Sequence, residues 1–232
     1  MSAVAIEVVA TNAATPATWS DIWSLSQTLY DTDRDYVEQS LKQHQRIALF
    51  RAPDRLVGMA SIDVYPAEFR GRRLAVIFTG HVLLRPEYRG QNLIQRLGFR
   101  IFLGARLRYP LRRIYWFFDT FSYKSYLLMP RNFREFWPRY DRPTPAWELA
   151  LMDHLARQMY PEYWRPEQGI VARSGRKRLR PETAPLDAVA GDPHLEFYAR
   201  ANPGHSAGDM LVCLCPLSAS NWLSAGLRAL QR

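Results

Sequence analysis

The backbone between residues 82 and 97 has the features of a binding site for a diphosphate. An apolar, strand-like run ends at Arg85, the basic turn Tyr88-Arg89-Gly90 follows, and an apolar helical pattern begins directly afterwards. A strand that leads into a helix through such a turn directs unpaired amide N–H groups at one point, and the helix dipole adds partial positive charge there. Arg89 adds a cation beside the same point. The segment therefore predicts a site for a pyrophosphate.

This segment resembles the acyl-CoA-binding motif of the GNAT N-acyltransferase superfamily. Two positions depart from the family pattern, since Asn92 stands where a second glycine is usual and Ile94 where a third Gly or Ala is usual. Asn tolerates unusual backbone angles, whereas Ile94 places a branched side chain where backbone and phosphate should approach closely. The residues that match the pattern are Leu84, Pro86, Tyr88, Arg89, Gly90 and the apolar helix after them.

The resemblance implies an acyl-CoA donor, acetyl-CoA by default, and a primary amine of a small molecule or protein as the acceptor. The amine would attack the thioester directly in a ternary complex, with no metal. In the family the strand before the turn is splayed from its neighbour, so Val82 and Leu84 would offer free backbone groups to the pantetheine arm. The pyrophosphate would lie on Arg89, Gly90, Gln91, Asn92, Leu93 and Ile94.

Two further residues are candidates for proton transfer. Asp119, Ser122, Ser125 and Tyr126 resemble the family's Asn-x-x-Ala-x-x-Leu-Tyr signature, which implies that Tyr126 protonates the departing thiolate. A tyrosine that only packs in the core is the other reading, and Tyr123 is the neighbour most easily confused with it. His81, on the strand before the turn, is the best candidate for the base that deprotonates the amine, although a lone His in an apolar strand is more often structural. Asp119 and Asp63 are lesser alternatives.

Bulky and basic residues leave two alternative functions open. The aromatic run at residues 115–118 is read first as strand core, and otherwise as the wall of a pocket for an acyl group larger than acetyl. The net charge of +9 and the basic run at residues 173–180, expected to be exposed, favour an anionic partner such as an acidic acyl carrier protein. No RNA-recognition signature accompanies them, which disfavours nucleic acid. The second alternative is a catalytically inactive protein of this fold that binds acyl-CoA or a carrier protein.

Composition limits the remaining possibilities. The 232 residues are 47% hydrophobic, which is enough for a well-buried domain. The two cysteines, Cys213 and Cys215, form no metal motif and no disulfide framework, so we expect buried thiols. We also expect a cytoplasmic protein, because no secretion signal and no apolar run of about 18 residues is present.

Hydrophobic periodicity predicts the elements that position these residues. Strands are predicted at residues 5–10, 46–51, 56–65, 74–84, 113–118 and 209–214, with a bulge at Thr79 and Gly80. Helices are predicted at residues 19–30, capped by Ser20 or Asp21, and at 33–44, 93–108, 121–129, 144–159 and 219–231. Pro130 should end the fourth helix, and the last should present Trp222, Leu223, Leu227 and Leu230 on one face.

This order of elements is the core order of the GNAT fold, as the resemblance has it, over roughly residues 5 to 137. The expected fold class is therefore α/β (α+β), with a mixed, mostly antiparallel central sheet flanked by helices and a long C-terminal extension. Residues 1–137 would form the core, and residues 138–232 a family-atypical region packed on the same domain.

Overall fold

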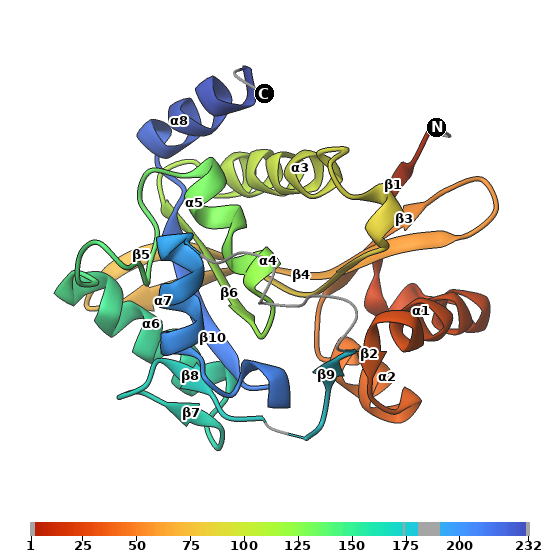
Figure 1. The fold of residues 1–232 in the computed structure, drawn as a ribbon. Coiled ribbons are helices and arrows are strands. Elements are labelled where there is room, and N and C mark those ends of the chain that lie inside the picture. Colours follow the sequence, from red (N-terminus) through yellow and green to blue (C-terminus); the bar gives the residue numbers. More distant parts are fainter. Residues whose placement is uncertain (1–2, 174, 181–190, 231–232) are drawn as a thin grey trace.

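An eight-stranded sheet runs through the centre of the protein. The computed structural model describes residues 3–173, 175–180 and 191–230. Within them the strand order is β1-β3-β4-β5-β6-β10-β8-β7, and every neighbouring pair is antiparallel except β5 with β6 (Figure 1). This confirms the predicted fold class. The strands are β1 (Ala5–Ala10), β3 (Arg46–Arg51), β4 (Leu56–Phe69), β5 (Arg72–Leu84), β6 (Arg113–Thr120), β7 (Trp164–Arg165), β8 (Ile170–Val171) and β10 (Met210–Pro216).

Helices cover both faces of the sheet, because successive strand residues point to opposite sides. Side chains of α3, α4, α5 and α7 pack on one face, and those of α1, α2 and α6 on the other. The last helix, α8, stands at the upper edge of the view in Figure 1, above α5. The helices are α1 (Pro16–Leu29), α2 (Arg34–Lys42), α3 (Leu93–Arg108), α4 (Tyr123–Tyr126), α5 (Leu128–Asn132), α6 (Ala146–Met159), α7 (Pro193–Ala201) and α8 (Ala219–Leu230).

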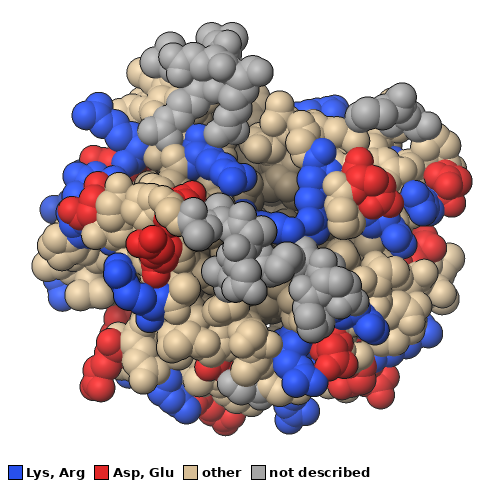
Figure 2. Space-filling model, viewed as in Figure 1, with Lys and Arg blue, Asp and Glu red and all other residues tan. Residues whose placement is uncertain are grey.

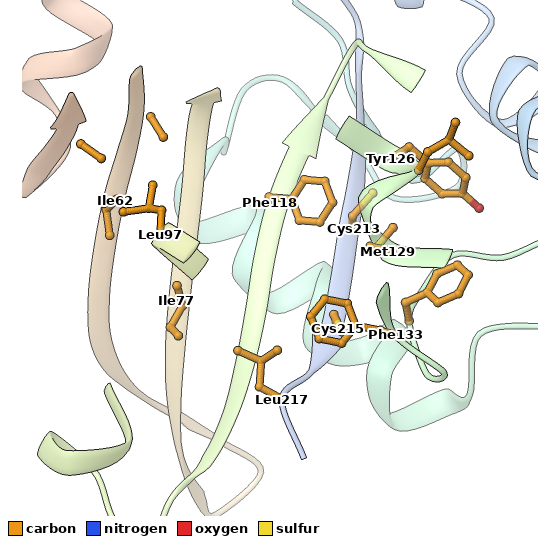
Figure 3. Close-up of a cluster of buried hydrophobic side chains, with 14 of the residues drawn as sticks. Ile62, Ile77, Leu97, Phe118, Tyr126, Met129, Phe133, Cys213, Cys215 and Leu217 are labelled. Atoms are coloured by element: carbon orange, nitrogen blue, oxygen red, sulfur yellow. The ribbon is translucent and has the colours of Figure 1, made fainter. Parts of the chain in front are cut away.

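The core on the α3 face joins the early and late parts of the chain. Ile77 of β5, Phe118 of β6 and Cys213 of β10 belong to one buried cluster with Leu97 of α3 (Figure 3). Cys213 and Cys215 are both buried and free, as predicted. Because β10 pairs with β6, a strand of the C-terminal third is part of the same sheet as the predicted core.

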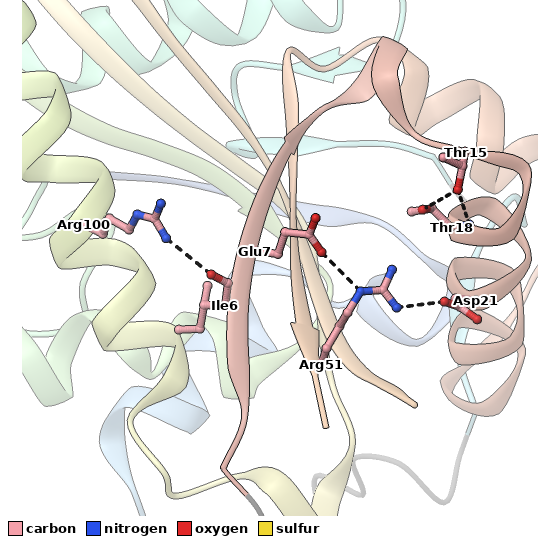
Figure 4. A network of polar contacts seen from close by, with 7 residues as sticks. All are labelled: Ile6, Glu7, Thr15, Thr18, Asp21, Arg51 and Arg100. Atoms are coloured by element: carbon pink, nitrogen blue, oxygen red, sulfur yellow. Dashed lines mark hydrogen bonds and ion pairs between the residues drawn. The ribbon is translucent and has the colours of Figure 1, made fainter. Parts of the chain in front are cut away.

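Polar contacts fix the first strand between its neighbours. The Arg51 guanidinium on β3 donates to Glu7 of β1 at 3.3 Å and to Asp21 of α1 at 2.9 Å (Figure 4). Arg100 of α3 donates to the Ile6 carbonyl at 3.3 Å, so α3 is tied to the edge of the sheet. These contacts tie the β1 edge of the sheet to α1 on one face and to α3 on the other.

Most predicted elements lie where the sequence places them, and the differences have local causes. The first helix begins at Pro16 with Thr15 as its cap, not Ser20 or Asp21, because the Thr15 side chain accepts from the Thr18 amide at 3.2 Å. The helix predicted at residues 121–129 is two short helices, α4 and α5. Pro130 lies in the first turn of α5 instead of ending a helix, since a missing N–H costs nothing there.

The terminal helix α8 does not present Trp222 and Leu223 on one face, contrary to what the sequence predicts. Trp222 packs against Phe102 with ring centroids 4.5 Å apart, whereas the next residue, Leu223, is 69% exposed. Trp222 therefore faces the domain, whereas Leu223 faces solvent. The side chains of Leu227 and Leu230, and Gln231 as a whole, lie outside the described part of the chain. The sequence pattern does not predict the short helix α7.

None of the helices within the described ranges combines the length and the apolar character that crossing a membrane requires.

Candidate active site

A gap opens between the two parallel strands of the sheet. β5 and β6 pair from Leu74 and Arg113 as far as Phe78 and Phe117, and no pairing between them is found beyond that point in the described chain. Both strands continue, and Figure 3 shows them diverging beyond Ile77. A hydrogen bond from Trp116 Nε1 to Thr79 Oγ1, 2.8 Å long, spans the strands where they separate. The backbone of β5 beyond Thr79 is therefore unpaired on the side of β6.

A β-bulge in β5 lies beside this gap. Ser61 of β4 faces Gly80 and Met59 faces Leu83. His81 and Val82 therefore oppose a single residue of β4, Ala60. The bulge thus lies two residues beyond the predicted position at Thr79 and Gly80. His81 has a left-handed backbone with φ of 50°, which few non-glycine residues adopt. The extra residue keeps His81 on the α2 side of the sheet while Val82 packs on the α3 side.

One cavity of about 950 Å³ passes through the gap. Its lining includes side chains from the α3 face, such as Trp116 and Phe118, and others from the opposite face, such as His44 and Tyr160. Residues on opposite faces of a sheet can line one cavity only where strands are apart. Figure 2 shows the hollow on this face of the molecule, with Lys and Arg side chains on its rim.

We call the part of the cavity on the α1/α2/α6 face the polar arm. Its described lining carries several ionisable groups, among them Lys177, His81, Asp119 and Arg173. Lys177 Nζ lies 3.1 Å from His81 Nδ1 and 4.0 Å from the centre of the Tyr30 ring. Burial lowers the pKa of Lys177 to about 7, against a smaller opposing effect of the Asp119 carboxylate. Lys177 therefore exchanges a proton near neutral pH.

His81 and Asp119, the ionisable neighbours of Lys177, also have shifted pKa values. Burial holds the pKa of His81 well below its usual range, and the charges of Lys177 and His44 lower it further. His81 is therefore neutral and accepts a hydrogen bond from Lys177. Burial also raises the pKa of Asp119, and the Tyr160 hydroxyl donates a hydrogen bond to that carboxyl group.

A second histidine faces the same arm. His44 Nδ1 lies 2.6 Å from Asp63 Oδ2, and the Gln45 amide donates to the other carboxylate oxygen at 2.6 Å. The contact with the carboxylate places a proton on Nδ1 and fixes the orientation of the ring. The His44 ring stacks on Phe78 and meets the edge of His81, with ring centroids 5.6 Å apart. Asp63, a lesser candidate for the base, thus positions His44.

Lys177 is a site residue that the sequence pattern does not predict. The expectation of an exposed basic run at residues 173–180 is wrong for Lys177, which is only 7% exposed. A two-stranded sheet of β2 (Tyr30–Asp31) with β9 (Arg178–Leu179) turns it inward, and Thr32 Oγ1 donates to the Arg176 carbonyl at 3.1 Å. Composition offers one signal that could have found it. The chain has three lysines, Lys42, Lys124 and Lys177, among 31 Lys and Arg residues, so a lysine within an arginine run is unusual here.

The turn before α3 presents free amides. Gly90 and Asn92 have positive φ values of 81° and 54°, and Asn92 makes no side-chain cap to the helix. Within the described residues, no acceptor for the amides of residues 90–95 is found, so they point to solvent or a ligand. Arg89 is exposed, and its Nε donates to the Leu84 carbonyl at 3.3 Å.

The structure brings only some of the predicted site residues to the cavity. His81, Val82 and Ile94 line it. Leu84 pairs with Gly58 of β4, and the predicted pyrophosphate residues Arg89, Gly90, Gln91, Asn92 and Leu93 precede the lining, which begins on α3 at Ile94. No cluster of three or more potential metal ligands is found among the described residues.

Tyr126 lies apart from the other predicted catalytic residue. Its side chain is fully buried and packs beside Phe136 and Tyr198, and its hydroxyl donates to the Pro138 carbonyl at 3.2 Å. It is not part of the cavity lining, and Figure 3 shows its hydroxyl directed away from the gap between β5 and β6. Burial raises its pKa above the usual range. The structure thus does not bring Tyr126 together with His81.

Comparison with known proteins finds similarity among solved structures. No protein-family model and no curated protein sequence matches the chain. An Enterococcus faecalis protein of unknown function, described as a probable N-acyltransferase, is 17% identical over 68% of this chain, with a TM-score of 0.40. The match spans 44% of that protein's length.

Two further structures are similar to the chain. A Desulfovibrio desulfuricans protein assigned to the GNAT family is 14% identical over 61% of this chain and 92% of its own, with a TM-score of 0.42. An aminoglycoside N-acetyltransferase in complex with CoA is 15% identical over 55% of this chain and 83% of its own, with a TM-score of 0.40. The Desulfovibrio protein is assigned to the family that the turn before α3 resembles. At such scores the similarity transfers no function, which must come from the geometry of the site.

Proposed function

We propose that the protein is an acyltransferase that moves an acyl group from acyl-CoA to a primary amine. The single observation that carries this proposal is the course of the cavity through the gap between β5 and β6. On one side of the sheet the cavity begins at Ile94, directly after the turn with free amides. On the other side it reaches Lys177 and His81. A thioester threaded through the gap would meet an amine on the far side.

The donor would bind by its phosphates and its pantetheine arm. The amides of residues 90–95 lie at the positive end of the α3 dipole, and Arg89 adds a cation, which suits a pyrophosphate. From there the pantetheine arm would pass Ile94 and enter the gap. Its amide groups would pair with the backbone of β5 near Val82, which β6 leaves unpaired. The free left-handed turn at Asn92 supports this arrangement, because it leaves the approach to the amides open.

Acyl transfer needs a proton acceptor and a proton donor, and Lys177 can serve as both. The amine nitrogen attacks the thioester carbonyl, the C–N bond forms and the C–S bond breaks. Neutral Lys177 takes the proton that the amine loses, and the resulting ammonium returns it to the thiolate, so no net proton is consumed. A pKa of about 7 is near the ideal for such a group at neutral pH. His81 accepts the hydrogen bond of Lys177 and keeps Nζ facing the cavity.

The acceptor would occupy the polar arm. Its described lining offers hydroxyl, amide and carboxyl groups from Tyr36, Gln43 and Asp119, which are suited to a polar amine, whether a small molecule or a protein side chain. The Asp119 carboxyl group would accept a hydrogen bond from the neutral amine and hold it beside Lys177.

Mass spectrometry of the protein incubated with acyl-CoA and a panel of amines tests the function. We expect a product heavier by the acyl group, together with free CoA. Calorimetry tests the donor site separately, with Arg89→Ala expected to weaken CoA binding by about tenfold or more. Arg73→Ala, which removes an exposed arginine at the other end of β5, is the matched control and should bind CoA as the wild type does. Absence of both CoA binding and product would refute the proposal.

A further inference from the structure

The half of the cavity beneath α3 has a different character from the polar arm. We call it the apolar arm. Ile101 and Phe102 of α3 form one wall, Trp116 and Phe118 of β6 form the floor, and Trp222 of α8 lies at the far end. Arg96 is the one ionisable side chain that the described lining contributes on this side, and it is exposed in the first turn of α3. The arm is therefore suited to a ligand without charge.

Aromatic rings close the end of the apolar arm. The Trp222 ring lies 4.5 Å from Phe102 and 5.9 Å from Phe133, measured between centroids, and Trp116 stacks on Phe118 at 4.4 Å. The lining extends along α3 from Ile94 to Phe102, about 12 Å at the rise of an α-helix. The arm thus leads away from the amide-rich turn and ends in a hydrophobic wall.

We propose that the apolar arm binds the hydrocarbon chain of a medium- or long-chain acyl donor. The inference rests on the proposed function, because the arm and the polar arm are one cavity joined at the gap where the thioester would lie. An acetyl group would leave the arm unfilled, whereas a longer chain would bury apolar surface against Ile101, Phe102 and Trp116. Each buried methylene group is worth roughly fourfold in affinity.

The polar groups near the arm argue against a nucleotide base as its occupant. A purine or pyrimidine ring needs hydrogen-bond partners at its edge. Asn132, the amide side chain that α5 contributes to the lining, already donates to the Leu128 carbonyl at 2.6 Å. Trp222 Nε1 is a buried donor for which the described chain supplies no partner, and the remaining walls are aliphatic or aromatic along most of their length. An alkyl chain therefore fits most of the arm.

Donor selectivity tests the assignment. We expect octanoyl-CoA to be used with a kcat/KM at least about tenfold above that of acetyl-CoA. Ile101→Trp should fill the arm and lower turnover of octanoyl-CoA by about tenfold or more, while acetyl-CoA is used as before. Leu103→Trp is the matched control, because Leu103 lies on the same helix but is 47% exposed and outside the cavity lining. This variant should use both donors with the kcat/KM of the wild type. Equal use of both donors by the wild type would overturn the inference.

A binding measurement separates this inference from the proposed function. A fatty acid brominated at its end should quench the fluorescence of Trp116 and Trp222, because bromine quenches an indole only on close approach. We expect quenching in the wild type and Leu103→Trp, and its loss in Ile101→Trp with an unchanged melting temperature. Trp222→Phe should remove part of the quenched signal. If no acyl transfer is found but quenching follows this pattern, the assignment of the apolar arm is supported and the proposed function is refuted. Absence of quenching in the wild type overturns the arm.

Discussion

Lys177 Nζ lies 3.1 Å from His81 Nδ1, although the two residues are 96 positions apart in the chain. His81 reaches this position through the bulge in β5, and Lys177 through the pairing of β9 with β2. The Lys177 charge lowers the pKa of His81, and burial favours the neutral form of both groups. Under the proposed function, this contact makes the two residues a proton-transfer pair beside the gap.

Replacement of Lys177 should abolish most catalysis. Lys177→Met removes the base, and Lys177→Arg keeps a cation that does not lose its proton near neutral pH. Both should lower kcat by about a hundredfold or more. The wild-type kcat/KM should rise with pH as Lys177 loses its proton, with an inflection near the pKa of about 7, and then level off. Steady-state rates between about pH 5.5 and pH 9, on either side of that pKa, check this. Retention of full activity in Lys177→Arg would exclude the role.

The same substitution should stabilise the folded protein at low pH. Burial lowers the pKa of Lys177 from 10.5 to about 7, so the unfolded chain binds more protons than the folded chain between these values. The penalty is present in full below about pH 7 and disappears as pH rises through 10.5. Its upper limit is roughly 5 kcal/mol, from about 1.4 kcal/mol per pKa unit.

Because Lys177→Met also loses contacts with His81 and Tyr30, we expect a gain of about 2 kcal/mol in unfolding free energy at about pH 6. Urea denaturation at about pH 6 and about pH 10 checks this, with the gain shrinking at the higher pH. A gain that grew with pH would contradict the assigned direction.

Tyr126→Phe should leave activity nearly unchanged and lower stability. The substitution removes the hydrogen bond from the hydroxyl to the Pro138 carbonyl in a buried setting, which costs about 1–2 kcal/mol. The reacting atoms should not be affected, because Tyr126 is not part of the cavity lining. Thermal denaturation and the acyl-transfer assay, run on the same preparation, separate the two effects. A large loss of kcat with intact stability would restore the family-derived role of this tyrosine.

Gly90→Ala should weaken donor binding through the shape of the turn. Gly90 has φ of 81°, so an alanine there is strained by about 1 kcal/mol and would relax by rotating the neighbouring amides. We expect a several-fold weaker Kd for CoA by calorimetry. Gly71→Ala is the matched control, because Gly71 has φ of 72° in the β4–β5 turn and, like Gly90, has open space where the added methyl group would lie. Equal weakening in both variants would indicate a general effect of strain.

Sequence reasoning succeeded where local pattern decides structure. The bounds of β1, β3 and α3 follow from periodicity and turn residues alone, and the gap beside β5 agrees with what the family resemblance implied. The orientation of the Tyr126 side chain could not be predicted from the sequence. It depends on packing against α7, a helix that the sequence pattern does not predict. Lys177 was missed for a similar reason, since a run of basic residues is usually solvated unless a distant strand turns it inward.

The β2–β9 pairing has a consequence for how such a chain can diverge. Lys177 enters the cavity on a short edge segment held to Tyr30 and Asp31, on the opposite face of the sheet from α3 and the turn that precedes it. Under the proposed function, substitutions in that segment would change which amine is accepted and would leave the amides before α3 intact. Preference for the acceptor and preference for the donor could then change separately within one scaffold.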